Sequence, residues 1–257
     1  MTFKSQMFFL SHDKMLEFLR RLDGGAEPSA LSLYLPPSLP LSGLNYLLGK
    51  TNLQPLPKEV AGTITSSKSG AVLFRSDSQN HLILPPFPLR KKGVFLGYNI
   101  EPLSLLLESN YNIGLVLVHL GTYAIGISRG EKLVSSKVGT GLIHGRHKKG
   151  GSSQQRFQRR RQNQIQEFLD KVCRHIMEQF EPFSKHLDYI IYGGPHQTVL
   201  RLQKRCSFLK SLESKTLPPI DVPALRHKVL EVTVGRIWSS SIIEWQDNRT
   251  QVTVDRQ

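Results

Sequence analysis

Acidic residues are missing from a long stretch in the middle of this sequence. No Asp or Glu occurs between Glu131 and Glu167, and the whole chain has 20 acidic residues against 34 Lys and Arg. The resulting net charge of +14 favours a polyanionic partner, either nucleic acid or an anionic membrane surface. Disorder is excluded, because 39% of the residues are hydrophobic and this is enough for a folded core.

Long hydrophobic runs are also missing. No apolar stretch reaches the ~18 residues that a membrane-spanning helix needs. The N-terminal segment has only a short apolar patch and no small-residue cleavage site, so we expect no signal peptide. These absences weaken the membrane alternative and predict a cytoplasmic protein whose partner is nucleic acid, with no membrane contact.

Cysteine is rare, and the common catalytic motifs are missing. Cys173 and Cys206 are the only cysteines and neither lies in a C-x-x-C pair, so we expect buried free thiols in a reducing cytosol and no zinc site. The sequence contains no Walker loop, no G-x-G-x-x-G, no H-E-x-x-H and no G-x-S-x-G. We therefore predict neither a metal nor a cofactor.

The first part of the chain has the pattern of a small α+β domain, which we assign to residues 1–108. The Pro-, Gly- and Ser-rich segment 39–69 gives no clear prediction. The predicted elements are an amphipathic helix at 13–23, a strand at 30–38, and a hairpin formed by 70–76 and 81–86.

Residues 109–240 have a different pattern, which predicts a mixed sheet with packed helices, as in an RNase H-like domain. Residues 241–257 are assigned to a C-terminal tail. The predicted elements are a three-strand meander at 112–120, 122–128 and 131–139, a long helix that ends before Pro182, a buried strand at 187–194, a helix from 195 to about 209, and a strand at 229–235. The apolar stripe of the long helix, predicted to face the core, consists of Ile165, Phe168, Leu169, Val172, Cys173, Ile176, Met177 and Phe180.

The basic loop, residues 144–161, follows the meander and is the candidate functional site. Its sequence, HGRHKKGGSSQQRFQRRR, contains seven Lys or Arg residues around Gly150, Gly151, Gln154 and Gln155. Glycine lets a backbone approach a ligand closely, and Lys and Arg suit phosphates. The alternative is a basic loop without chemistry, because charge runs of this kind are often disordered.

This loop and the helix after it resemble the Vms-like release factor family, peptidyl-tRNA hydrolases related to the eukaryotic and archaeal class I release factors. The resemblance covers about residues 113–235 and depends on K-K-G-G-S-S-Q at 148–154, the R-F-Q-R-R-R continuation, and Y-G-G-P at 192–195. The strand S-L-Y-L-P-P at 32–37 is similar to one in the N-terminal domain of release factors. Release factors have a contiguous Gly-Gly-Gln, whereas Ser152 and Ser153 intervene here.

The resemblance implies hydrolysis of the ester between a nascent peptide and tRNA, on stalled ribosomal large subunits in ribosome quality control. Gln154 would orient water, and Gly150 and Gly151 would let the loop reach the tRNA end; Gln155 is the alternative to Gln154. The partners implied are peptidyl-tRNA and the large subunit with its RNA, for a monomeric protein that needs no stop codon. The RNA-binding residues expected in the loop are Arg146, His147, Lys148, Lys149, Arg156, Arg159, Arg160 and Arg161.

Other interpretations of the loop stay open. His144 and His147 could act as a general acid or base, but His among Lys and Arg more often contacts phosphate, and Ser152 and Ser153 have no carboxylate nearby to complete a triad. The protein could instead be a non-catalytic rescue factor resembling Pelota. A metal-dependent nuclease needs clustered carboxylates, which the first strand of the meander does not supply. Metal-free cleavage of the tRNA 3′ end remains a further alternative.

Overall fold

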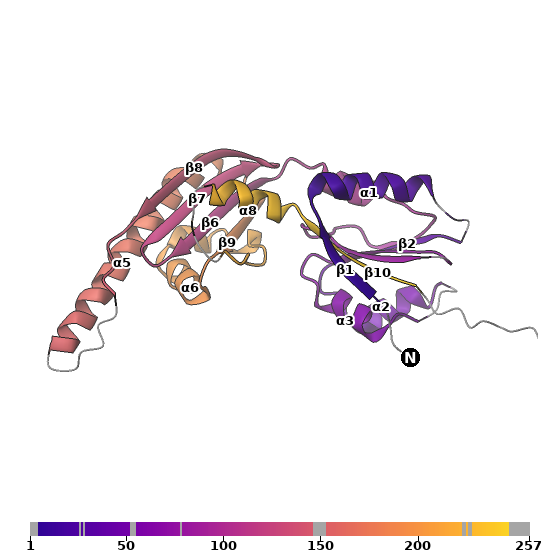
Figure 1. Cartoon of the computed structure of the whole chain (residues 1–257), viewed down its shortest axis with the longest axis horizontal. Helices are drawn as coiled ribbons and strands as arrows, with labels where there is room; N and C mark the ends of the chain where they lie inside the picture. Colours follow the sequence, from indigo (N-terminus) through magenta and orange to yellow (C-terminus); the bar gives the residue numbers. More distant parts are fainter. Residues whose placement is uncertain are drawn as a thin grey trace, which may run out of the picture. The chain divides into compact units, whose positions relative to one another are not determined.

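The computed structural model describes residues 5–25, 27, 29–51, 55–77, 79–145, 153–222, 225 and 228–246. The chain forms two compact units (Figure 1). Unit 1 comprises Met1–Glu108 and Trp238–Gln257, and unit 2 comprises Ser109–Ile237. Each unit has its own β-sheet covered by helices, so the mixed α+β class predicted from the sequence is confirmed.

Unit 1 is built on a six-stranded sheet in which every described pair is antiparallel, in the order β1-β10-β4-β3-β2-β5. Helix α1 lies on one side of this sheet, and α2 and α3 lie on the other (Figure 1). The elements are β1 (Ser5–Leu10), α1 (His12–Gly24), β2 (Leu31–Leu35), α2 (Leu41–Leu48), α3 (Lys58–Ser66), β3 (Ala71–Arg75), β4 (Asn80–Leu84), β5 (Gly93–Leu96), α4 (Glu101–Leu107) and β10 (Ser240–Trp245).

Helices α2 and α3 lie in the segment 39–69, for which no element was predicted. Each begins directly after a proline, at Pro40 and Pro57, and each is only eight or nine residues long. Their apolar side chains pack with Leu33, Leu73 and Leu82 of the sheet in one buried cluster. Burial against the sheet, and not helix propensity, therefore stabilises these short helices.

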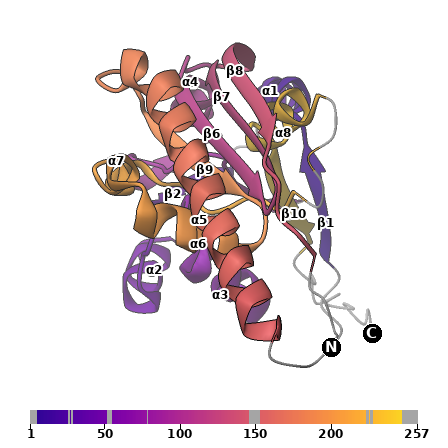
Figure 2. The same ribbon diagram turned by 90° about the vertical axis from the view of Figure 1, so that its left-hand side faces the viewer.

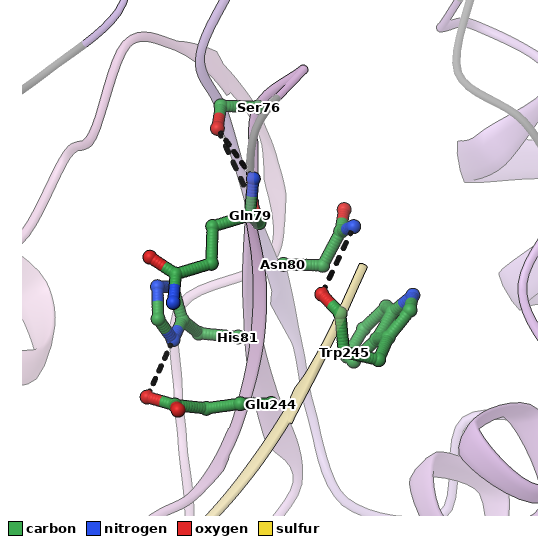
Figure 3. A network of polar contacts seen from close by, with 6 residues as sticks. All are labelled: Ser76, Gln79, Asn80, His81, Glu244 and Trp245. Atoms are coloured by element: carbon green, nitrogen blue, oxygen red, sulfur yellow. Dashed lines mark hydrogen bonds and ion pairs between the residues drawn. The ribbon is translucent and has the colours of Figure 1, made fainter. Parts of the chain in front are cut away.

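Strand β10 returns the C-terminal part of the chain to unit 1, although residues 241–257 were predicted to be a tail. It lies between β1 and β4, and Ile242 pairs with Phe8 on one side and Ile83 on the other. Polar side chains line this junction (Figure 3). His81 Nδ1 lies 3.2 Å from Glu244 Oε1, and the Asn80 amide donates to the Trp245 carbonyl. The assignment of residues 241–245 to a tail is therefore wrong; residues 247–257 lie outside the described residues.

Unit 2 is built on a four-stranded mixed sheet in the order β8-β7-β6-β9. The first three strands form the predicted antiparallel meander, and β9 is parallel to β6, with Leu115 opposite Ile191. The elements are β6 (Asn112–His119), β7 (Thr122–Arg129), β8 (Lys132–Thr140), α5 (Ser153–Phe180), β9 (Tyr189–Gly193), α6 (His196–Arg205), α7 (Ser207–Lys210) and α8 (Val229–Ile237).

Helices α5 and α6 cover one face of this sheet, side by side (Figure 2), and α8 packs on the other face. The predicted apolar stripe of α5 faces the core, except for Met177, which is 42% exposed. Residues 229–235 were predicted to be a strand because they are rich in valine, and this prediction is wrong. The segment forms α8 because Leu230, Thr233 and Val234 recur at helical spacing on its buried side.

The two cysteines are bonded to each other and are not free thiols. Cys173 lies on α5 and Cys206 follows the last residue of α6, and packing of these two helices brings their Cα atoms to 5.5 Å. This distance is typical of a disulfide. The prediction of buried free thiols is therefore wrong, because the helix packing that joins the residues cannot be derived from their sequence separation of 33.

None of the helices in the described ranges is both long enough and apolar enough to cross a membrane.

Candidate functional site

The basic loop follows the last residues of strand β8, at one end of the sheet of unit 2. Strand β8 ends at Thr140, where the Gly141 amide donates to the Gly121 carbonyl in the turn between β6 and β7. The structure describes the predicted loop segment up to Gly145 and again from Ser153, where α5 begins. Residues 153–161 are therefore helical and not part of a loop as predicted, and from here on the basic loop means residues 144–152. Six predicted site residues lie outside the described residues, namely Arg146, His147, Lys148, Lys149, Gly150 and Gly151.

The residues that lead into the basic loop contact α5 at successive positions along the helix. Lys171 donates its ammonium to the Thr140 carbonyl at 3.0 Å, and the Phe168 ring lies against Gly141 so closely that an added Cβ would be 2.5 Å from Cδ2. Ile143 packs against the core of unit 2. The chain therefore runs back along α5, towards the first turns of the helix.

Two polar side chains of α5 bind His144, the residue at which the basic loop begins. The Gln164 side-chain oxygen accepts the His144 amide at 3.2 Å, and Arg161 donates Nε to the His144 carbonyl at 3.0 Å. Both backbone groups of His144 are thus satisfied by α5. These contacts fix the base of the basic loop on the helix, about two turns from the N-terminus of α5.

Gln154 lies in the first turn of α5, and its side chain is exposed. Positions 154, 158, 161 and 165 are separated by four and three residues, so they share one side of the helix. This side leads into the buried stripe that begins at Ile165. Gln155 is exposed as well but is rotated away from this side, since one residue turns a helix by about 100°.

Three of the predicted RNA-binding arginines form an exposed group on the first turns of α5. Arg156, Arg159 and Arg160 lie on the side of the helix opposite Gln154, again by helical spacing. Arg161 is different, because it lies on the side of Gln154, is half-buried and is bonded to His144. The helix therefore presents three exposed arginines on one side, and Gln154 with the half-buried Arg161 on the other.

Sequence comparison assigns the chain to a family. The model of the Actinobacteria/chloroflexi VLRF1 release factor family matches residues 111–243, just over half of the chain. The chain belongs to this family. The match includes the whole of the loop, α5 and the strands around them, and it confirms the resemblance to Vms-like release factors that the sequence motifs indicated.

The relatives of the chain include archaeal release factors. Peptide chain release factor subunit 1 of Archaeoglobus fulgidus is 24% identical in an alignment 246 residues long that covers 83% of this chain and 60% of that protein. The same factor of Aeropyrum pernix is 26% identical in an alignment 219 residues long that covers 72% of this chain and 58% of that protein. The chain therefore spans about 60% of the length of these relatives.

Solved structures give a weaker match. The archaeal translation termination factor aRF1 has a TM-score of 0.36 and 20% identity, over 88% of this chain and 73% of that one. Pelota of Archaeoglobus fulgidus has a TM-score of 0.26 and 11% identity, over 92% of this chain and 66% of that one. Neither score adds to the assignment made from sequence.

The Y-G-G-P motif at 192–195 forms the predicted turn between a strand and a helix. Tyr192 and Gly193 end β9, Gly194 has φ +114°, and Pro195 precedes the first residue of α6. A Cβ on Gly194 would lie 2.1 Å from the Val118 carbonyl oxygen at the end of β6. The motif therefore serves the close packing of two parallel strands, and its role is structural.

The remaining candidates of the loop have no catalytic arrangement in the described residues. His144 is exposed, and the described contacts of its backbone are those with α5. His147 and Ser152 lie outside the described residues, as does the side chain of Ser153. The sequence analysis missed Gln164 and Lys171, which attach the loop, because a Gln or Lys in a helix carries no signal of a partner 20 or 31 residues earlier.

Proposed function

We propose that this protein is a peptidyl-tRNA hydrolase that frees nascent peptides from tRNA on stalled ribosomal large subunits. The observation that carries the proposal is the geometry of α5. Its first turn holds Gln154 on an exposed side of the helix, and Arg161, on that same side, bonds to His144 at the start of the basic loop. Family membership and the archaeal release factor relatives support the same reaction.

In the proposed reaction a water molecule attacks the carbonyl carbon of the ester between peptide and tRNA. The ester C–O bond breaks, one proton goes to the departing ribose oxygen, and the peptide leaves with a free carboxylate. Gln154 cannot be a strong general base, because its amide is neutral. Its role is to position water and to donate to the developing oxyanion, a contribution of about 3 kcal/mol for one well-placed donor.

The start of α5 suits this role. The first amide groups of any helix lack intrahelical acceptors, and the helix dipole makes its N-terminus positive. No acidic residue lies near in sequence, since the next one after Glu131 is Glu167. Gly150 and Gly151, just before the helix, would let the backbone approach the tRNA end without a Cβ.

The exposed arginines would hold the RNA while the amide side faces the ester. Arg156, Arg159 and Arg160 lie opposite Gln154, so phosphate contacts on the outer side of α5 would leave the inner side available for the reacting bond. Arg146, His147, Lys148 and Lys149 complete the proposed phosphate contacts. The partners proposed are peptidyl-tRNA and the RNA of the large subunit.

Paired substitutions at the two glutamines test the role of Gln154. Gln154→Ala should remove most single-turnover release of peptide from peptidyl-tRNA on isolated large subunits, with a fall of roughly 100-fold or more in rate. Gln155→Ala is the matched control, since it removes the same group one residue away, and should stay within a few-fold of wild type. Cosedimentation with large subunits should be unchanged in both. A dead Gln155→Ala with an active Gln154→Ala would overturn the assignment.

A further inference from the structure

Unit 1 carries a second concentration of positive charge, at the edge of its sheet. Tyr46 and Lys50 lie on α2 and directly after it, and Lys91 and Lys92 precede the edge strand β5. No Asp or Glu occurs between Glu27 and Glu59 or between Asp77 and Glu101, so both segments that supply these residues are free of acid. We call Tyr46, Lys50, Lys91 and Lys92 the lysine–tyrosine surface.

Two lysines of this surface lie over aromatic rings. The Lys50 ammonium lies 4.5 Å from the centre of the Tyr46 ring, and Lys50 and then Lys92 hold the pKa of the Tyr46 phenol below its ordinary value. Lys91 lies 5.4 Å from the centre of the Phe95 ring on β5. Val94 of β5 packs against the same hydrophobic cluster as Leu44 and Leu47 of α2, so α2 and the start of β5 lie on the same face of the sheet.

The backbone that carries these side chains is held in place. Leu89, just before the basic turn, is buried, and its amide donates to the Ser69 carbonyl at 2.9 Å. β5 then pairs with β2, with Gly93 opposite Tyr34. The Tyr46 ring is 65% exposed on a helix whose opposite side is buried through Leu44 and Leu47. The charges and the ring are therefore presented to solvent on ordered elements.

We propose that the lysine–tyrosine surface binds a single-stranded segment of RNA, with phosphates on the lysines and an unstacked base on Tyr46. An exposed aromatic ring among cations is the combination that binds single strands, because the ring stacks on a base and the charges follow the backbone. RNA supplies both a base for the exposed ring and phosphates for the lysines, whereas an anionic membrane supplies no base. The choice of RNA over DNA rests on the proposed function. The surface lies in unit 1 and its binding does not depend on hydrolysis at Gln154.

The first test measures binding of a labelled 12-nucleotide single-stranded RNA to the full chain by fluorescence anisotropy over a range of salt. The protein carries Arg156, Arg159 and Arg160 as Gln, so that α5 contributes less. Lys50→Gln, Lys91→Gln and Lys92→Gln together should weaken binding at least tenfold and reduce the slope of log K against log salt by about 2, since each phosphate contact with a single strand contributes about 0.7.

The matched control removes three exposed cations from α1 of the same unit, as Lys14→Gln, Arg20→Gln and Arg21→Gln. It should change the slope by less than one contact. If the control lowers affinity and slope as much as the lysine variant does, the binding is a property of net charge and the proposal is overturned. Binding to anionic vesicles tests the membrane alternative. If the lysine variant loses vesicle binding but keeps RNA binding, the surface binds a membrane and the proposal is overturned.

Tyr46 is tested separately from charge. Tyr46→Ala should weaken the same RNA at least fivefold with an unchanged salt slope, and Tyr46→Trp should restore binding, because stacking of one base contributes roughly 1–3 kcal/mol. Equal affinity of Tyr46→Ala and wild type would contradict the stacking role. Crosslinking of 4-thiouridine-substituted large subunits and of 4-thiouridine-substituted tRNA to the Tyr46 peptide then distinguishes ribosomal RNA from tRNA as the source of the strand.

Discussion

Arg161 and Arg160 are neighbours in the sequence with different environments. Arg161 donates Nε to the His144 carbonyl, whereas Arg160 is exposed on the outer side of α5. Arg161→Ala should loosen the base of the basic loop, at a cost of about 1 kcal/mol for one lost hydrogen bond, and raise amide hydrogen exchange in residues 141–145. Arg160→Ala should leave that exchange unchanged and reduce the salt slope of RNA binding by about one contact. The reverse pattern would contradict these assignments.

Gly194 and Gly235 predict opposite effects of the same substitution. A Cβ on Gly194 would lie 2.1 Å from the Val118 carbonyl oxygen, at a φ of +114°, so Gly194→Ala should destabilise unit 2 by roughly 2–4 kcal/mol. Gly235 lies in α8 with nothing within 4 Å of an added Cβ, and Gly235→Ala should stabilise it by about 0.5–1 kcal/mol. Amide hydrogen exchange in β6 and β9 measures the change in stability for both variants. Equal effects of the two substitutions would show that the backbone around Gly194 and Val118 can move to accommodate a Cβ.

Residue identity predicted only part of this site. The resemblance to release factors indicated Gln154, and residue type indicated the arginines, but neither separated Arg161 from Arg160 or Gln154 from Gln155 by their place on the helix. The separation comes from the phase of α5, which is fixed by the buried stripe from Ile165 onwards. The helical phase of positions 154–161 could be predicted by continuing the spacing of the stripe backwards. The bond from Arg161 to His144 could not be predicted, because His144 lies 17 residues earlier and outside the helix.

At the scale of elements, β10 depends on a buried histidine of β4. Burial lowers the pKa of His81 below the ordinary value of 6.5, and the nearby Glu244 carboxylate raises it in part. Because the folded-state pKa is depressed, protonation favours the unfolded state. The contribution of neutral His81 to the free energy of unfolding of unit 1 is therefore fully present above about pH 6.5 and is lost as the pH falls through the folded-state pKa. Unit 1 should be easier to unfold with urea at pH 5.5 than at pH 7.5.

His81→Gln should make the stability of unit 1 less dependent on pH across this interval. Tryptophan fluorescence is a selective measure, because the chain has two tryptophans, Trp238 and Trp245, and both are buried in unit 1. Glu244→Gln removes the group that raises the pKa, so it should steepen the loss at low pH. An unchanged pH dependence in His81→Gln would assign the effect to other groups.

The bond between Cys173 and Cys206 joins α5 to the end of α6. Closing a loop of about this separation stabilises a protein by roughly 3–4 kcal/mol in the chain-entropy description, so Cys206→Ser should lower the thermal midpoint of unit 2. Reductant should lower the wild-type midpoint by the same amount and leave the variant unchanged. Alkylation of both thiols in unfolded, never-reduced protein would contradict the bond.

Elements with local partners were the ones the sequence predicted well. The hairpin of β3 and β4 and the meander of β6, β7 and β8 join neighbouring segments through short turns, so alternating apolar residues and glycines were sufficient. α8 was predicted wrongly, because valine favours strands until burial on one side of a helix outweighs that preference.

At the scale of the whole molecule, the largest difference from the prediction is the return of the chain to unit 1. β10 pairs with β1 and β4, more than 150 residues earlier in the sequence, and no local pattern encodes such a contact. The two units nevertheless correspond to two kinds of surface in the proposals above. Unit 2 would carry the reaction at Gln154, and unit 1 would bind RNA at the lysine–tyrosine surface.

The most direct test of the central claim is the mass of the tRNA after one turnover on isolated large subunits that hold peptidyl-tRNA and present no codon. Ester hydrolysis predicts a full-length tRNA with an intact 3′ end and a peptide with a free carboxylate, formed by wild type and not by Gln154→Ala. The reaction should survive removal of protein-bound metal by EDTA, with magnesium restored for the ribosome. A tRNA shortened at its 3′ end, or equal release by wild type and Gln154→Ala, would contradict the account.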